Sequence, residues 1–138
     1  MQKTRRLRLQ SVILEELSMI VPREIKDPRI PMITFTSVEV TDDGSEATIH
    51  VSILGRNLNP PAAGEETEEQ MAAREEADDA EMQDCLDGLI SASGYLRRHL
   101  GTILNVRHVP KLHFKEDRGI QNVNRVFHLL KQIEKEKS

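Results

Sequence analysis

The chain has 138 residues, one cysteine and a net charge of −4, which excludes an intramolecular disulfide and a metal site built from cysteines. A chain of this length buries one core of ordinary size, so a single domain over residues 1–138 is expected, with a mainly aliphatic core because only 3% of residues are aromatic. Acidic residues interrupt the apolar part of the first 21 residues, so we predict neither a secretory signal nor a membrane span, and we expect a soluble cytoplasmic protein without membrane association.

Apolar residues recur at spacings of three and four over residues 3–21, which predicts an amphipathic helix. Three arginines lie in its first turns: Arg5, Arg6 and Arg8. Positive charge there opposes the helix dipole, so either an anionic partner covers these side chains or they form a solvated basic end. Pro22 is expected to end the helix, and the prolines within residues 23–31 predict a rigid connector.

Two stretches rich in β-branched residues follow, at 32–41 and 46–54. Both alternate between apolar and polar positions, and the turn sequence Asp-Asp-Gly-Ser separates them, so they predict a β-hairpin. Strict alternation in the first strand places Phe35 on the side opposite to Val38 and Val40.

The acidic charge is concentrated in residues 56–87, which carry a net charge of −9 and leave +5 on the rest of the chain. Asparagine, proline and glycine precede an acidic stretch with few bulky apolar residues, which predicts a flexible insertion at about 56–80 with a frayed helix near 66–80. Such an insertion either keeps the protein soluble or acts as an acidic arm that competes with RNA for the protein's basic face.

From Met82 to Leu104 the helical spacing of apolar residues continues through the sequence SASG at 91–94 without a change of phase. Since Gly94 costs a helix interior about 1 kcal/mol relative to alanine, we predict two helical halves with one buried face and a bend between them.

Residues 106–117 predict a third strand with Leu112 and Phe114 facing inward, and residues 120–133 predict a last helix. The resulting order is helix, strand, strand, kinked helix pair, strand, helix. This order predicts an α+β domain with the helices packed on one face of a three-stranded sheet.

Four motifs in this order resemble the bacterial ribosome-binding factor A family, whose fold is a type II KH-like domain. The motifs are REIKDPRI at 23–30, VSILG at 51–55, ASGYLRRHLG at 92–101 and VRHVPKLHFKED at 106–117. In an ordinary KH domain a GxxG loop lets the nucleic-acid backbone approach closely. An Ala-x-Gly kink replaces that loop in the family, and Ala92-Ser93-Gly94 matches it.

The resemblance implies a non-enzymatic factor of ribosome biogenesis. Such a factor binds the immature small ribosomal subunit, assists maturation of the 5′ end of its 16S rRNA and supports growth in the cold. An assembly GTPase stays open as a further partner, and we expect a monomer. The acidic insertion also leaves an alternative from another class, a protein-interaction module that recruits a basic partner.

Charge and resemblance together predict an RNA-binding surface. Its candidate residues are Arg5, Arg6, Arg8, Ala92, Ser93, Gly94, Tyr95, Arg97, Arg98, Arg107, Lys111 and Lys115. Each phosphate that such cations neutralise releases counterions, and arginine forms forked hydrogen bonds to phosphate. Two alternatives remain open: Gly94 serves only packing against the sheet, and Tyr95 either stacks on a base or packs on the sheet.

No sequence feature predicts an enzyme, a cofactor or a metal site. His108 and His113 point to opposite faces of the expected strand, and no acidic or cysteine partner has the spacing of a ligand set. The sequence contains no glycine-rich phosphate loop and no hydrolase or metalloprotease motif. Cys85 lies on the apolar stripe of its helix and is expected to be a core residue.

Overall fold

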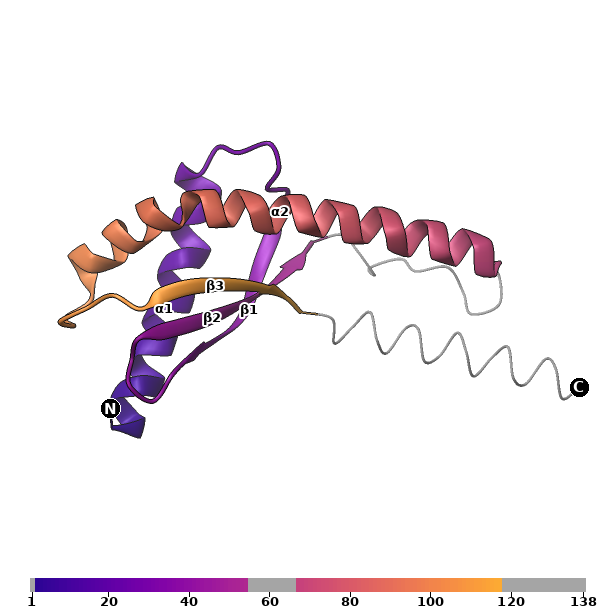
Figure 1. Cartoon of the computed structure of the whole chain (residues 1–138). Coiled ribbons are helices and arrows are strands. Elements are labelled where there is room, and N and C mark those ends of the chain that lie inside the picture. The colour runs from indigo at the N-terminus through magenta and orange to yellow at the C-terminus, as the bar shows by residue number, and fades with distance from the viewer. Residues whose placement is uncertain (1, 55–66, 118–138) are drawn as a thin grey trace, which may run out of the picture.

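The computed structural model describes residues 2–54 and 67–117. Its elements, in chain order, are α1 (Lys3–Glu24), β1 (Ile33–Val40), β2 (Glu46–Ile53), α2 (Glu68–Ile103) and β3 (Lys111–Glu116). In the sheet, β2 lies in the centre and pairs antiparallel with β1 and parallel with β3. This arrangement, drawn in Figure 1, confirms the predicted α+β class. The helix predicted at 120–133 lies outside the described residues.

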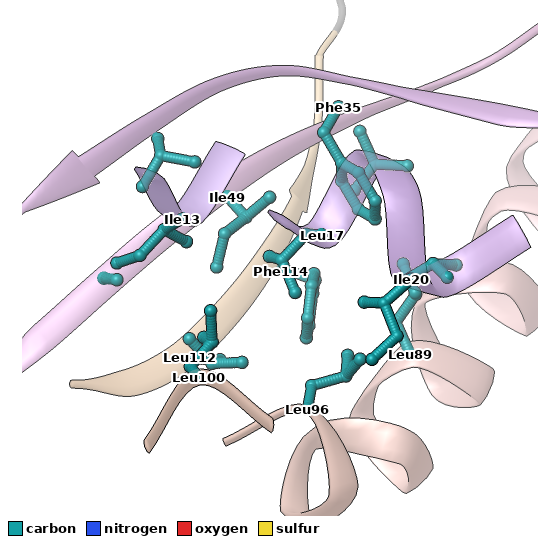
Figure 2. Close-up of a cluster of buried hydrophobic side chains, with 14 of the residues drawn as sticks. Ile13, Leu17, Ile20, Phe35, Ile49, Leu89, Leu96, Leu100, Leu112 and Phe114 are labelled. Atoms are coloured by element: carbon teal, nitrogen blue, oxygen red, sulfur yellow. The ribbon is translucent and has the colours of Figure 1, made fainter. Parts of the chain in front are cut away.

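The core lies between the two helices and one face of the sheet. In Figure 2, side chains of α1, α2 and all three strands point into one space. β2 supplies alternate residues, from Ala47 to Ile53, to this core, as expected for a strand with one buried face. Leu112 and Phe114 of β3 are buried as predicted, and the ring of Phe114 lies 6.3 Å from that of Phe35, centroid to centroid.

A β-bulge changes the phase of β1. Phe35 is opposite Val51 while Ser37 is opposite His50, so Thr36 is an extra residue in the ladder. As a result Phe35, Val38 and Val40 are all buried. The predicted placement of Phe35 on the opposite side was wrong, because a bulge shifts every later side chain to the other face.

The predicted end of α1 at Pro22 was also wrong. The helix continues through Pro22 to Glu24, and the backbone N–H of Ile25 bonds to the carbonyl of Val21. Proline has the φ angle of a helix, but it lacks the N–H that would bond to the residue four positions earlier and its ring crowds that residue's carbonyl. This loss falls in the last turn, where the buried residues Ile20 and Val21 hold the helix on the sheet.

α2 is one continuous helix rather than a pair of helical halves. It runs from Glu68 to Ile103 through the sequence SASG, and in Figure 1 its axis curves toward the C-terminal end without a break. Because the apolar stripe keeps its phase through residues 91–94, the helix follows the core by curving. Cys85 and Leu89, just before the curve, are fully buried.

The frayed helix predicted near 66–80 is the first part of α2 and has a well-defined beginning. Thr67 accepts the N–H of Gln70 through its side chain, and the Gln70 side chain accepts the N–H of Thr67. This is a capping box, and the acidic side chains of Glu68 and Glu69 favour the positive end of the helix dipole. Residues 55–66, the first part of the predicted insertion, are outside the described part of the chain.

Candidate nucleic-acid interface

The predicted RNA-binding residues occupy three separate places in the fold. The first is the outward side of α2, with residues 92–95, Arg97 and Arg98. The second is the end of the molecule where α1 begins and α2 ends, with the three arginines of α1 and Arg107. The third is the face of the sheet opposite to the helices, with Lys111 and Lys115. The sequence therefore identified basic residues that do not form one continuous surface.

Gly94 lies on the solvent side of α2. Apart from the adjacent residues and the backbone of the surrounding helical turns, no described atom lies within 4 Å of the position that a Cβ would take at Gly94. The structure thus excludes the hypothesis that this glycine makes room for the sheet. Ser91, Gly94 and Arg98 are all exposed, and their spacing places them on the same helix face. We call this the open face of α2.

Other side chains at residues 92–97 of α2 make contacts within the protein. Ala92 is partly buried against the core, and the hydroxyl of Ser93 donates to the carbonyl of Ile90. Arg97 Nη2 donates to the carbonyl of Val109 at 3.0 Å, in the segment that leads into β3. Among the described residues, Arg98 has no ion-pair partner. The charge of Arg98 is therefore the most available one on the open face.

Tyr95 connects the open face to the end of α1. Its hydroxyl donates to the carboxylate of Glu24, which raises the pKa of the phenol because the hydrogen bond and the nearby negative charge both favour the protonated form. Tyr95 is 41% exposed, and the bond of its hydroxyl to Glu24 brings the end of its ring to the end of α1. The positive charges of Arg23 and Arg98 act in the opposite direction and lower the pKa of the phenol, so both cations lie near it.

The connector between α1 and β1 crosses α2 at Gly88. A Cβ at Gly88 would lie 2.8 Å from Ile30 Cγ1 and 3.3 Å from Asp27 Oδ2, far closer than normal packing allows. Beside this crossing, Arg29 Nη2 donates to Ser91 Oγ at 3.2 Å. Gly88 therefore lets the connector approach α2, and the approach brings Arg29 to the edge of the open face.

Asp27 holds the side chain of Arg29. Its carboxylate accepts Arg29 Nη2 at 2.7 Å and Nε at 3.1 Å, and it accepts the backbone N–H of Arg29 at 2.9 Å. These hydrogen bonds lower the pKa of Asp27 and raise the pKa of Arg29. The arrangement is a bidentate pair that fixes the plane of the guanidinium.

Charge along α2 changes sign near Gly88. From Glu68 to Asp87 the helix carries nine carboxylates and one arginine, whereas from Gly88 to Ile103 it carries two arginines and no carboxylate. The end of α1 and the connector add three exposed cations, Arg23, Lys26 and Arg29, and Arg29 bonds to Ser91 of α2. The prediction missed these three cations, although all lie in the motif REIKDPRI, because only the folded chain shows that this motif packs on α2.

The second group of arginines is partly engaged. Arg5 Nη2 donates to the carbonyl of Asn105 at 3.4 Å, and Arg6 forms an ion pair with Asp42 in the hairpin turn. Arg8 and Arg107 are exposed. This end of the molecule carries positive charge but is separate from the open face of α2.

The third group lies on the outer face of the sheet. Leu112 and Phe114 point to the helices, so Lys111 and Lys115 point to the other side. There His113 Nε2 lies 3.1 Å from Glu46 Oε1, and Ser37 Oγ lies 3.0 Å from His50 Nδ1. The outer face is therefore of mixed charge.

Neither a metal cluster nor a membrane span is found in residues 2–54 and 67–117. No group of three or more histidine, cysteine, aspartate or glutamate side chains in these ranges has an arrangement that could hold a metal ion. Neither helix of these ranges contains an uncharged apolar stretch of the length that crosses a bilayer.

Comparison with known proteins gives one family. The family model described as Ribosome-binding factor A matches residues 5–130. The chain is 37% identical to ribosome-binding factor A of Geobacter sulfurreducens over 130 residues, which is 94% of this chain and 92% of that protein. It is 34% identical to ribosome-binding factor A of Thermomicrobium roseum over 137 residues, which is 99% of this chain and 89% of the relative.

A solved structure has the same fold. The crystal structure of ribosome-binding factor A from Thermus thermophilus aligns with a TM-score of 0.57 at 20% identity, and the alignment covers 83% of this chain and 98% of the other. At this identity the likeness concerns the fold alone. It supports the arrangement of two helices on a three-stranded sheet.

Proposed function

This chain belongs to the ribosome-binding factor A family, and from this membership we propose that it is a non-enzymatic ribosome assembly factor. It binds the immature small ribosomal subunit in the cytoplasm and assists maturation of the 5′ end of its 16S rRNA. Binding favours one conformation of the rRNA over others, so the factor acts by a population shift and breaks no bond itself.

The observation that carries this proposal is the open face of α2. A Cβ at Gly94 would meet nothing within 4 Å beyond its own helical turns among the described residues, so the helix backbone is accessible there, and Arg98 lies one turn further along. A sugar-phosphate backbone needs this combination, because close approach and fixed positive charge position a strand without reading its bases.

The other two basic groups have different parts in the proposal. Arg5 and Arg8 at the beginning of α1, together with Arg107 in the segment after α2, contact a second segment of rRNA. Lys111 and Lys115 lie on the opposite side of the sheet from the open face, so a strand on α2 does not reach them. We therefore assign the main contact to Gly94, Tyr95 and Arg98, with the lysines as a separate and weaker surface.

Co-sedimentation tests the function. The purified full-length protein is run through a sucrose gradient with mature small subunits and with small subunits isolated during assembly. We expect co-migration with the small subunit, stronger for the immature form. A protein that stays at the top of the gradient with both preparations contradicts the proposal.

Filter binding to transcribed 16S rRNA tests the surface. Arg98→Gln is expected to weaken binding about tenfold and to reduce the log–log salt slope by about 0.7–0.9, the value for one lost phosphate contact. The matched control is Lys115→Gln, which removes one positive charge from the outer face of the sheet and should have the smaller effect. Equal losses for both variants would contradict the assignment to α2.

The acidic part of α2 supports a second candidate, recruitment of a basic protein. In Figure 1 this part of the helix extends beyond the sheet, and Glu68, Glu69 and Glu76 are exposed. Neutralising these three side chains to glutamine leaves the cap and the basic surface intact. Retained or stronger subunit binding by this variant supports the RNA-binding function, whereas its loss supports recruitment.

A further inference from the structure

The connector between α1 and β1 carries an arginine whose guanidinium is oriented on one side and exposed on the other. Asp27 takes the Nε and Nη2 donors of Arg29, and Ser91 accepts a further bond from Nη2. Among the described residues, no hydrogen-bond partner is recorded for Nη1. The side chain of Arg29 is 44% exposed, so the Nη1 donors have access to a ligand.

We infer that Arg29 is a phosphate-binding residue of the RNA interface and that Asp27 is its positioning residue. This inference rests on the proposed function and extends the surface from α2 to the connector. The phosphate contacts Arg29 at its Nη1 side and lies next to Ser91, whose hydroxyl accepts from Arg29 and keeps its own proton for a phosphate oxygen. Ligand recognition is by charge and geometry, and no base is read.

A purely structural role does not account for this arrangement. The bidentate pair joins two residues of the same connector, and among the hydrogen bonds of Arg29 only the one to Ser91 Oγ, at 3.2 Å, reaches α2. The crossing itself is formed by the close contact of Ile30 with Gly88. Ion pairs between exposed side chains contribute little to stability. The pair fixes the plane of the Arg29 guanidinium. A fixed plane reduces the conformational entropy that is lost when a phosphate binds.

The surrounding charges define the side from which a phosphate approaches. Asp84 and Asp87 on α2 both act on Arg29 and raise its pKa, so negative charge lies on the side toward the beginning of α2. Arg98 and Gly94 follow Ser91 on the other side, and Arg23 lies near Tyr95. A strand that follows the open face from Arg98 therefore reaches Arg29 before it meets the acidic part of the helix.

Asp27→Asn gives a test in which two explanations predict opposite signs. The substitution removes a negative charge next to the RNA, so binding by net charge alone predicts tighter binding. If Asp27 positions Arg29, the variant binds transcribed 16S rRNA about three- to tenfold more weakly, because the amide offers one acceptor oxygen and the charged bidentate pair that fixes the guanidinium is lost. Asp84→Asn is the matched control. It removes a carboxylate that also acts on Arg29 but for which no hydrogen bond to Arg29 is recorded, and it should bind as tightly as the wild type or more tightly.

Arg29→Gln and Arg29→Lys complete the experiment. Arg29→Gln is expected to weaken binding about tenfold and to reduce the salt slope by about 0.7–0.9. Arg29→Lys keeps the charge but loses the fork, so it should retain most of the slope and still bind more weakly than the wild type. Urea unfolding midpoints check that each variant is folded. If Arg29→Gln is unfolded, Arg29→Lys and Asp27→Asn decide the question.

The outcomes separate this inference from the proposed function. Loss of rRNA binding by the wild type itself overturns the proposed function. If the wild type binds and Arg98→Gln weakens binding, but Arg29→Gln and Arg29→Lys bind as the wild type does, only the role of Arg29 is overturned. Tighter binding by Asp27→Asn would overturn the positioning role of Asp27, because it would show that the carboxylate affects RNA binding only through its negative charge.

Discussion

Two glycines of α2, less than two turns apart, have opposite surroundings. Gly88 is buried, and a Cβ there would lie 2.8 Å from Ile30. Gly94 is exposed, and a Cβ there would meet no described atom within 4 Å other than those of the adjacent residues and of its own helix backbone. Each costs a helix roughly 1 kcal/mol relative to alanine. The close contact with the connector compensates for this cost at Gly88, whereas nothing described in the fold compensates for it at Gly94. The comparison therefore indicates a packing role for one glycine and an external role for the other.

The largest effect on the free energy of unfolding is expected on the buried side of α2, in contrast to the open face. Leu96 is fully buried, so Leu96→Ala should lower the free energy of unfolding by about 2–5 kcal/mol through lost burial and a cavity. Arg98→Ala, on the open face, should change it by less than about 0.5 kcal/mol. Urea unfolding followed by circular dichroism measures both. Similar losses for the two variants would mean that the open face is covered by other parts of the protein.

Gly88→Val is expected to have the next largest effect. The new side chain must displace Ile30 and the connector, and overpacking of this kind lowers the free energy of unfolding by about 1–3 kcal/mol. Gly94→Val provides the control in the same helix, with an expected change near zero because the gain in helix propensity over glycine is only about 0.4 kcal/mol. The same urea unfolding assay compares them. If Gly88→Val is as stable as Gly94→Val, the connector does not pack on α2 as the structure describes.

Gly94→Ala should move stability and RNA affinity in opposite directions. Removing the cost of glycine in an exposed helix interior raises the free energy of unfolding by about 0.5–1 kcal/mol. The added methyl group lies on the open face, so affinity for 16S rRNA should fall. Gly101→Ala is the matched control, because a Cβ there makes only an ordinary contact of 3.5 Å with Val109. It should leave RNA affinity unchanged. If Gly94→Ala is more stable than the wild type and binds 16S rRNA equally tightly, Gly94 has no role in RNA binding.

The sequence predicted the three strands and α1 because each has a strong local pattern, whereas it predicted α2 only in pieces, as a frayed helix followed by two helical halves. Alternation and helical spacing identified β2, β3 and α1, and the inward side of Leu112 and Phe114 followed from period two alone. The bulge at Thr36 escaped notice because each half of β1 alternates correctly and only pairing with β2 reveals the extra residue. The regular beginning of α2 was foreseeable, since Thr67 and Gln70 have the spacing of a capping box.

The candidate site was only half predictable. Positive charge and the resemblance of Ala92-Ser93-Gly94 to the kink of the family selected Gly94 and Arg98, and the structure places both on the exposed side of α2. The contribution of the connector depends on a contact between segments far apart in the chain, Ile30 against Gly88. No local pattern carries that information, and the proximity of Arg29 to Ser91 follows from it. The same reason explains why Lys111 and Lys115 were grouped with α2 although they lie on the other side of the sheet.

The smallest expected effect concerns the acid that holds Arg29 beside Gly88. Hydrogen bonds from Arg29 lower the pKa of Asp27 in the folded protein, so the unfolded chain binds a proton more readily. The stabilisation from this carboxylate is therefore complete above its ordinary pKa of about 3.9 and is lost as the pH falls through the lower folded value. Wild type and Asp27→Asn should differ in urea midpoint at neutral pH and converge as the pH falls below about 4.

Asp43→Asn supplies the comparison, because Ser45 and Thr41 lower the pKa of Asp43 to about 2 in a turn that does not involve α2. Its difference from the wild type should persist to about pH 2. A difference for Asp27→Asn that does not change with pH would show that the negative charge of Asp27 contributes nothing to the stability of the folded protein.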